Sequence, residues 1–304
     1  MTTVDSRAAE ALKKRVVAVL NPASGGVDTH AEARTKEIFT QAGLPHAEVV
    51  SAGPAEIDAA LAKAVTEADV LVVLGGDGTI RAAAARCAGF AGFLVPLPGG
   101  TMNMLPKALY GTRAWPEALA DTLADPHAHD VSGGMAGDHA FFVAALLGAP
   151  TLWTDAREAV RAGHLVEAVE KSLTAARRSL SEPLKYEFTP AMRGAAEAVA
   201  VVCPLISKVM NEDERMLEAA AIDPETAGEA LRLGFHALFD GWREDPTVKR
   251  AKVKSLRVVG RGPVPAIVDG EKVRMGRVVD IRFTPLAFRA LVPGAPEEAV
   301  AAPS

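Results

Sequence analysis

Residues 69–79 read DVLVVLGGDGT, and this stretch decides the fold. Asp69 to Leu74 is an apolar run of strand length, which predicts a strand buried on both faces, as in a parallel sheet. Gly75–Thr79 then leads into an alanine-rich segment, which predicts a helix to about Ala88. Glycines after such a strand let the backbone approach a phosphate, and the following helix directs N–H groups toward it. The stretch therefore predicts an α/β fold with a phosphate site at a strand's carboxyl end.

Strands and helices alternate on both sides of this stretch. Short apolar runs predict further strands, and apolar residues at helical spacing predict the helices between them. Such alternation is typical of a parallel sheet covered by helices on both faces. The expected strands are Val16–Leu20, His46–Ser51 and Phe93–Leu97, and the expected helices are His30–Gln41, Ala55–Glu67 and one that opens at Gly99-Gly100-Thr101.

The second half of the chain has a different pattern. Short strand-like segments are separated by proline, glycine and charged turns, which indicates an antiparallel β domain with helical insertions. The expected strands are Leu184–Phe188, Ala198–Val202, Ala251–Val259, Val264–Val268 and Val278–Phe283, and the expected helices are Asp155–Leu180 and Ala227–Phe239.

Three glycine-rich loops follow apolar strands of the first half: Asn21–Gly26 (NPASGG), Gly75–Thr79 and Pro98–Asn103 (PGGTMN). Ligands of open α/β sheets bind outside the carboxyl ends of the strands, where these loops are expected to meet. Hydroxyl groups of Ser24, Thr79 and Thr101 are further donors to a phosphate. Three compatible loops in one sheet are a stronger signal than one GGDGT.

Asp77 places a carboxylate in the middle of this phosphate site. One interpretation is that it caps the following helix, because aspartate is a favoured N-cap residue. The other is that it contacts Mg²⁺ or acts as a base toward an attacking hydroxyl, because sites rich in phosphate need a metal to neutralise charge.

Composition and missing motifs exclude several classes of protein. Lys and Arg total 33 against 38 Asp and Glu, for a net charge of −5, which argues against a general nucleic-acid binder. No Gly-Lys dipeptide occurs, so there is no Walker A loop, and neither a Rossmann GxGxxG nor protein kinase motifs are found.

Cys87 and Cys203 are expected to be buried free thiols, as in a reducing compartment. No window is apolar enough to span a bilayer, so we expect a cytoplasmic protein.

The segments Asn21–Gly25 (NPASG), Gly75–Thr79 and Gly100–Asn103 (GTMN), with Val268–Glu271 (VDGE) near the other end, resemble the diacylglycerol kinase catalytic-domain family. The resemblance is to its bacterial lipid kinases, which are related to sphingosine and ceramide kinases. It implies two domains with the active site in the cleft between them. One is an ATP-binding α/β domain, residues 1–126 with 287–304, and the other a β-sandwich domain for the lipid, residues 127–286.

The resemblance also implies roles for individual residues, with ATP and Mg²⁺ as cofactors. Asp77 and Glu271, one from each domain, would be the catalytic and metal-linked carboxylates, and Asp130 is a third candidate metal ligand. Nine residues would bind the nucleotide: Asn21, Ser24 and Gly25 in the first loop, Gly76, Gly78 and Thr79 in the second, and Gly100, Thr101 and Asn103 in the third.

The chain departs from the pattern of these relatives at several positions. Arg81 stands where relatives often have asparagine, and Met104 where many have aspartate or histidine. Residues 202–207 (VCPLIS) lack the glycines that relatives carry in this part of the second domain. Because the second domain is expected to select the lipid, this last departure concerns the substrate more than ATP.

We therefore expect an ATP-dependent kinase that phosphorylates the primary hydroxyl of a membrane lipid, diacylglycerol-like by default. A ceramide or sphingoid-base kinase is the first alternative, and an NAD kinase-like enzyme or a non-catalytic nucleotide- or lipid-binding protein the next. The enzyme would visit the inner face of the membrane as a peripheral protein, without nucleic acid, and a homodimer is compatible with the sequence. The basic residues Lys249, Arg250, Lys252, Lys254 and Arg257 form either a solvated strand face or a contact with anionic headgroups.

Overall fold

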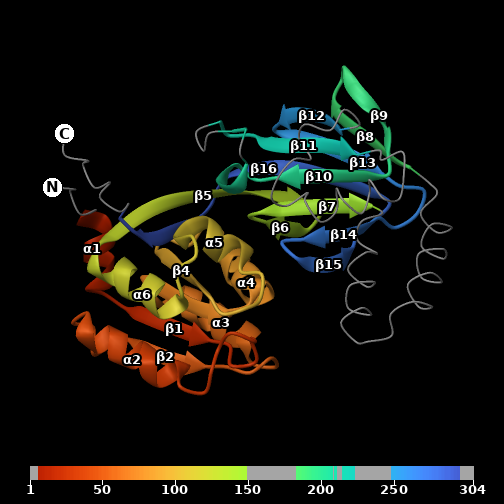
Figure 1. The fold of residues 1–304 in the computed structure, drawn as a ribbon. Helices are drawn as coiled ribbons and strands as arrows, with labels where there is room; N and C mark the ends of the chain where they lie inside the picture. The colour runs from red at the N-terminus through yellow and green to blue at the C-terminus, as the bar shows by residue number, and fades with distance from the viewer. Residues whose placement is uncertain (1–5, 149–182, 208, 211–213, 223–247, 295–304) are drawn as a thin grey trace, which may run out of the picture. The chain divides into compact units, whose positions relative to one another are not determined.

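The computed structural model describes residues 6–148, 183–207, 209–210, 214–222 and 248–294 (Figure 1). It divides into two compact units: the first runs to Val131 and resumes at Leu286, and the second is Ser132–Pro285. The helices expected at Asp155–Leu180 and Ala227–Phe239 lie outside the described residues.

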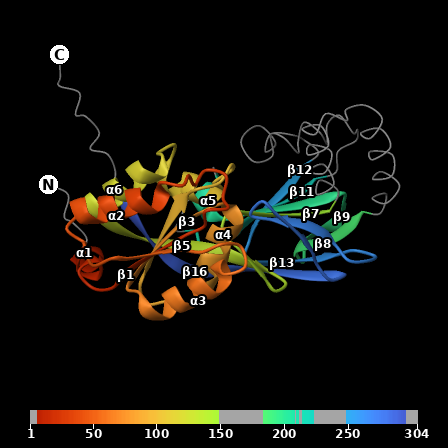
Figure 2. The same ribbon diagram turned by 90° about the horizontal axis from the view of Figure 1, so that it is seen from below.

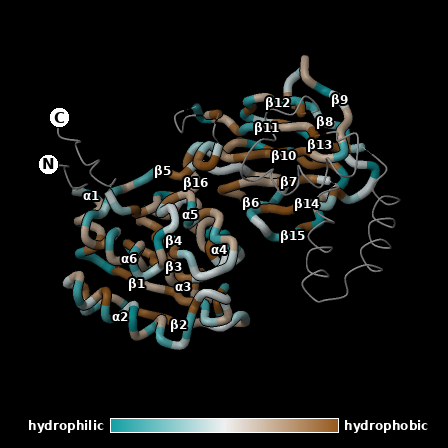
Figure 3. The backbone as a smooth tube through the Cα atoms, in the orientation of Figure 1, coloured by the Kyte–Doolittle hydropathy of each residue, from teal (hydrophilic) through white to brown (hydrophobic). Residues whose placement is uncertain are grey.

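The first unit is built on a parallel sheet with the strand order β2-β1-β3-β4-β16. The strands are β1 (Val16–Leu20), β2 (Glu48–Ser51), β3 (Val70–Gly75), β4 (Phe93–Pro98) and the end of β16 (Val278–Pro293). Every residue of β1 and β3 is buried, as their continuous apolar sequences predict. The apolar residues along these central strands stand out in Figure 3.

Helices cover both faces of this sheet. They are α1 (Ser6–Leu12), α2 (Ala31–Gln41), α3 (Ile57–Glu67), α4 (Asp77–Arg86), α5 (Met104–Tyr110) and α6 (Trp115–Ala124). One core combines buried residues of α2 and α6, such as Phe39 and Leu119, with alternate strand residues such as Val72 and Val95. The helix α3 lies on the opposite side of the sheet from α2 and α6 (Figure 2). The predicted parallel sheet with helices on both faces is therefore confirmed.

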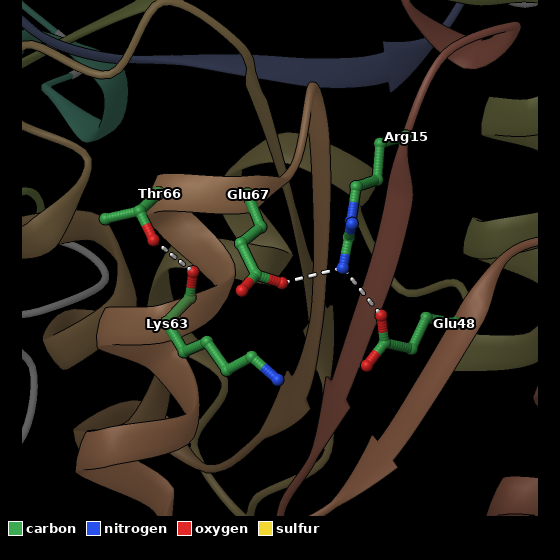
Figure 4. Close-up of polar contacts among 5 residues, drawn as sticks. All are labelled: Arg15, Glu48, Lys63, Thr66 and Glu67. Atoms are coloured by element: carbon green, nitrogen blue, oxygen red, sulfur yellow. Dashed lines mark hydrogen bonds and ion pairs between the residues drawn. The ribbon is translucent and has the colours of Figure 1, made fainter.

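An arginine joins two strands and a helix at the edge of the sheet where the strands begin, away from the glycine-rich loops. Arg15 precedes β1, and its guanidinium donates to Glu48 on β2 at 3.1 Å and to Glu67 at the end of α3 at 2.6 Å (Figure 4). All three side chains are at least one-third exposed, so we expect this network to contribute little stability.

The second unit is a sandwich of two antiparallel sheets. One contains β8 (Leu184–Thr189), β9 (Met192–Ala196), β13 (Ser255–Val259) and the first part of β16, with β5 (Pro126–Ala136) and β6 (His139–Phe141). The other has the order β12-β11-β10-β7-β14-β15: Val248–Val253, Leu217–Ile222, Ala198–Val202, Ala144–Gly148, Pro265–Val268 and Glu271–Arg274. A single core unites the facing sides, for example Tyr186 and Val258 of the first sheet with Leu147 and Val201 of the second.

The single strand expected at Ala251–Val259 is wrong, because the chain changes sheets there. β12 ends at Val253 in one sheet and β13 begins at Ser255 in the other. Val253 and Leu256 are both buried while the two residues between them are exposed. A spacing of three cannot place two side chains on one face of a continuous strand, whose period is two. Because the chain changes sheets at Lys254, the side chains of Val253 and Leu256 are both buried.

Two other expectations change in extent, and one helix is new. The strand expected at Val278–Phe283 continues to Pro293 as β16. The helix expected to open at Gly99-Gly100-Thr101 begins only at Met104, after the loop. The helix α6 was not expected from the sequence, although Ala118, Leu119 and Thr122 follow helical spacing on its buried face.

Candidate phosphate-binding site

The three glycine-rich loops meet in the first unit because their strands are neighbours. β3 pairs with β1 on one side and with β4 on the other, all in parallel. Parallel strands end at the same edge, so the loops Asn21–Gly26, Gly75–Thr79 and Pro98–Asn103 lie together there. The backbone joins them: Asn21 N–H donates to Leu74 O, and Gly26 N–H donates to Gly99 O, each at 2.9 Å.

The second and third loops approach so closely that their glycines cannot carry side chains. Gly99 N–H donates to Gly75 O at 2.9 Å. A Cβ atom on Gly100 would lie 2.7 Å from the Cα of Gly76, and one on Gly99 would lie 2.9 Å from the amide nitrogen of Gly75. Both distances are shorter than real contacts, so glycine is required here by space. The result is a strip of backbone without side chains, which a phosphate can approach closely.

Polar side chains of the first loop hold the second loop in place. Ser24 Oγ accepts the N–H of Gly76 at 2.9 Å, and Asn21 Nδ2 donates to Thr79 Oγ1 at 2.9 Å. Asn21 Oδ1 also accepts the N–H of Ala23 at 3.1 Å, which shapes its own loop. Three residues predicted to bind nucleotide, Asn21, Ser24 and Thr79, are therefore joined by hydrogen bonds that position the loops.

Asp77 is not the N-cap of the helix that follows, because Gly76 occupies that position and Asp77 is the first residue of α4. Its carboxylate accepts two backbone N–H groups of the third loop, that of Asn103 at 2.9 Å and that of Met104 at 2.6 Å. The half-buried Asp77 thus clamps the second loop to the third. Its two oxygens each retain further acceptor capacity, since a carboxylate has about four lone-pair sites.

Asn103 closes the third loop on itself. Its Oδ1 accepts the N–H of Gly100 at 2.7 Å, and its Nδ2 donates to the carbonyl of Gly100 at 2.9 Å. Its backbone is left-handed, with φ 51° and ψ 48°, a conformation that asparagine tolerates better than most residues. Thr101, between Gly100 and Asn103, is exposed, as is Gly25 in the first loop.

The first turn of α4 completes the site with unsatisfied donors. The first intrahelical hydrogen bond runs from Ile80 N–H to Gly76 O at 3.0 Å. The N–H groups of Asp77, Gly78 and Thr79 precede it and have no intrahelical acceptor. Together with the positive end of the helix dipole, they favour an anion at this position.

The remaining predicted carboxylates belong to other elements. Glu271 belongs to the second unit, where it is the exposed first residue of β15. Asp130, on β5, forms an ion pair with Arg289 at 3.3 Å. In the described part of the chain, no group of three or more His, Cys, Asp or Glu side chains is placed to hold a metal. Asp77 lies at the glycine-rich loops and is the carboxylate there that would help to hold a Mg²⁺ ion, because Mg²⁺ is usually bound by one or two carboxylates together with substrate phosphates.

Sequence reasoning missed Asp269, the residue that organises the Asp-Gly-Glu segment. It is only 5 % exposed, and its carboxylate accepts the N–H groups of Phe142, Val143 and Ala144 at 2.7, 3.0 and 2.9 Å. Asp269 and Gly270 form the two-residue turn of the β14–β15 hairpin, with φ of 47° and 87°. Positive φ at both positions is the signature of a type I′ turn, for which Asp-Gly is a preferred sequence. The Asp-Gly dipeptide is therefore the feature of the sequence that predicts this turn.

Comparison with known proteins agrees with this architecture. The family model of the diacylglycerol kinase catalytic domain matches residues 15–136. A search of curated proteins finds no significant match.

A crystal structure described as a diacylglycerol kinase from Bacillus anthracis str. Sterne is 17% identical in sequence, with a TM-score of 0.68, covering 92% of this chain and 97% of its own. A second structure from that organism is 19% identical, with a TM-score of 0.69 and the same coverage. At such identities these structures show a shared fold, while the family model covers the three loops themselves. Both comparisons therefore match the resemblance seen in the sequence, and residues 15–136, which carry the three loops, are similar to the diacylglycerol kinase catalytic domain.

Proposed function

We propose that this protein is an ATP-dependent lipid kinase, which transfers a phosphoryl group to the primary hydroxyl of a membrane lipid, with diacylglycerol as the default substrate. The observation that carries the proposal is the close backbone packing of Gly75, Gly76, Gly99 and Gly100 beside the first turn of α4, whose N–H groups have no intrahelical acceptor. The family match over residues 15–136 supports the kinase activity.

Phosphoryl transfer requires positioning and charge stabilisation more than covalent chemistry from the protein. The N–H groups of Asp77, Gly78 and Thr79 would bind phosphate oxygens, and the hydroxyl of Thr101 is an exposed donor beside them. Asp77 would hold the third loop against the second, so that both contact the same phosphates. Asp77 would also help to hold a Mg²⁺ ion, which would supply positive charge to offset the charge that develops on the phosphoryl group. We assign Glu271 as the candidate base that accepts the proton of the lipid hydroxyl.

Charge on the second unit supports an approach to an anionic membrane surface. Two of the five basic residues noted in the sequence are paired, Lys252 with Glu214 at 2.5 Å and Arg257 with Asp280 at 2.6 Å. The other three, Lys249, Arg250 and Lys254, are exposed on and beside the edge strand β12 and form no ion pair in the described structure. Each such cation contributes about 1 kcal/mol near an anionic surface.

A membrane approach of this kind would be peripheral. None of the helices in the described residues is long and apolar enough to cross a membrane. Reversing the charges of Lys249, Arg250 and Lys254 to glutamate should abolish sedimentation with anionic vesicles, and unchanged sedimentation would contradict a contact through β12.

The function is tested by phosphate transfer from labelled ATP in mixed micelles. The acceptor panel contains diacylglycerol, ceramide, a sphingoid base and NAD, each with and without Mg²⁺. We expect labelled product from diacylglycerol and only in the presence of Mg²⁺. Product from ceramide or the sphingoid base alone would reassign the lipid, whereas product from NAD alone, or from none, would overturn the lipid kinase proposal.

A further inference from the structure

Arg81, in the second turn of α4, has an unusual environment for an arginine. It is half-buried, and its Nε atom is buried without a hydrogen-bond partner. Among the side-chain nitrogen and oxygen atoms of the described residues, this is the one buried atom that lacks a partner. An unsatisfied buried donor is destabilising, and more so when the group is charged. No acceptor in the described part of the chain offsets this cost.

The other half-buried arginines of the first unit show what the fold normally provides. Arg86, the last residue of α4, pairs with Asp58 of α3. Arg113 pairs with Asp121 at 3.1 Å, and Arg289 pairs with Asp130 at 3.3 Å. Each of these guanidinium groups has a carboxylate partner, whereas Arg81 has none in the described structure. Arg81 therefore lacks the carboxylate partner that these three arginines have.

The position of Arg81 on α4 indicates which anion its guanidinium would bind. It lies four residues after Asp77, so both residues are on the same face of α4. Side chains of a helix lean toward its amino terminus, so Arg81 covers the preceding turn, which presents the open N–H groups. The carboxylate of Asp77 is not its partner, because Asp77 instead accepts the N–H groups of Asn103 and Met104. A phosphate in the loops would face both the helix terminus and the guanidinium.

We propose that Arg81 binds a phosphate oxygen of the nucleotide and thereby adds a charged ligand to the backbone strip. This inference rests on the proposed function, and it assigns a role to a residue that stands where relatives often have asparagine. A planar guanidinium suits two phosphate oxygens at once, and hydrogen bonds between charged groups are about twice as strong as neutral ones. Arg81 would thus be a nucleotide-binding residue of this chain.

The test compares Arg81→Met with Arg86→Met, a matched control on the same helix. Binding of ATP, ADP and inorganic pyrophosphate is measured by calorimetry, and melting temperature is measured with and without ligand. We expect Arg81→Met to bind ATP about 10- to 100-fold more weakly. Its melting temperature without ligand should not fall, because the substitution removes an unsatisfied buried donor. Arg86→Met should bind ATP like wild type.

Several outcomes would overturn the assignment. Binding of ATP and pyrophosphate by Arg81→Met within twofold of wild type would remove Arg81 from the site while leaving the kinase proposal intact. Wild-type protein that binds neither ligand would overturn both proposals. Weaker sedimentation of Arg81→Met with anionic vesicles, at unchanged ATP affinity, would show that a lipid phosphate is bound instead. If Arg81→Met does not fold, Arg81→Lys decides, because it keeps the charge and should lose less ATP affinity, about threefold to tenfold.

Discussion

The two units contain the same dipeptide after an apolar strand, Asp77-Gly78 in the first and Asp269-Gly270 in the second, and they use it differently. In the first unit it begins helix α4, and the half-buried carboxylate accepts two N–H groups from a loop. In the second unit it forms the turn of a hairpin, and the buried carboxylate accepts three N–H groups from residues 142–144. Both aspartates therefore act as braces, meaning that each carboxylate holds a separate backbone segment in place through hydrogen bonds.

The difference lies in what each brace leaves open. Asp77 joins two loops and leaves the N–H groups of the helix terminus available to a ligand. Asp269 is buried and accepts three backbone N–H groups, so its contacts serve stability. An aspartate in an Asp-Gly motif is thus not by itself evidence for catalysis. Its role depends on whether the neighbouring N–H groups are satisfied.

The largest expected effect is on stability, from Asp269→Ala. The substitution leaves three buried N–H groups without an acceptor, so we expect the free energy of unfolding to fall by about 3–5 kcal/mol. Urea denaturation measures this loss, with Asp138→Ala, at an exposed position, as the control. A loss below 1 kcal/mol would show that the second brace is not structural, and the contrast between the two aspartates would disappear.

The next effect is on catalysis, from Asp77→Ala and Glu271→Ala. We expect each to lower kcat by at least 100-fold, about 2.7 kcal/mol in activation free energy, while the fold survives. Asp77→Ala should also raise KM for ATP, because the third loop loses its clamp. Glu271→Ala should leave KM for ATP unchanged. Turnover like that of the wild type in both variants would refute the assignment of the site.

The smallest effect concerns the thiols. Burial raises the pKa of the Cys87 thiol to about 12. Burial and, in second place, the negative charge of Asp269 raise the pKa of the Cys203 thiol well above its ordinary value. A raised pKa means that little thiolate forms at neutral pH, so neither cysteine should react with a thiol reagent in the native protein.

Substitution of Asp269 separates these two causes. Asp269→Asn removes the charge, so it should lower the pKa of Cys203 and leave that of Cys87 unchanged. Mass spectrometry after labelling at rising pH distinguishes the two cysteines. Equal labelling of both cysteines in the variant would indicate global unfolding and contradict a local charge effect.

The first unit is predictable from sequence because its signals are local. A strand buried on both faces reads as an unbroken apolar run, and Val16–Leu20 was expected with the bounds that the structure shows. The second unit depends on which sheet each strand joins, a property of distant partners. The single strand predicted over 251–259 is therefore wrong, although the three-residue spacing of the buried Val253 and Leu256 marks the change of sheet. The bounds expected for the strand Ala198–Val202 are nevertheless confirmed.

The candidate site shows the same limit. The three loops were found because glycines and small polar residues are visible in the sequence. The partners of their side chains were not, since Asp77 reaches a loop 26 residues further along the chain. Asp269 contacts residues 127 positions earlier, and no local pattern announces this. The cleft between the domains and the roles of the site residues stay predictions.

The long strand β16 has a consequence for how the protein is made. Its Ala290 aligns with Leu94 of β4, its Leu291 is buried in the core of the first unit, and the carbonyl of Leu291 accepts the hydroxyl of Tyr110 at 3.1 Å. During synthesis the first unit must therefore wait for the whole second unit to be translated, roughly ten seconds or more at usual rates. Until then β4 is an open apolar edge, which is an aggregation hazard. The unit that leaves the ribosome first is completed last, and newly made chains should depend on chaperones during that interval.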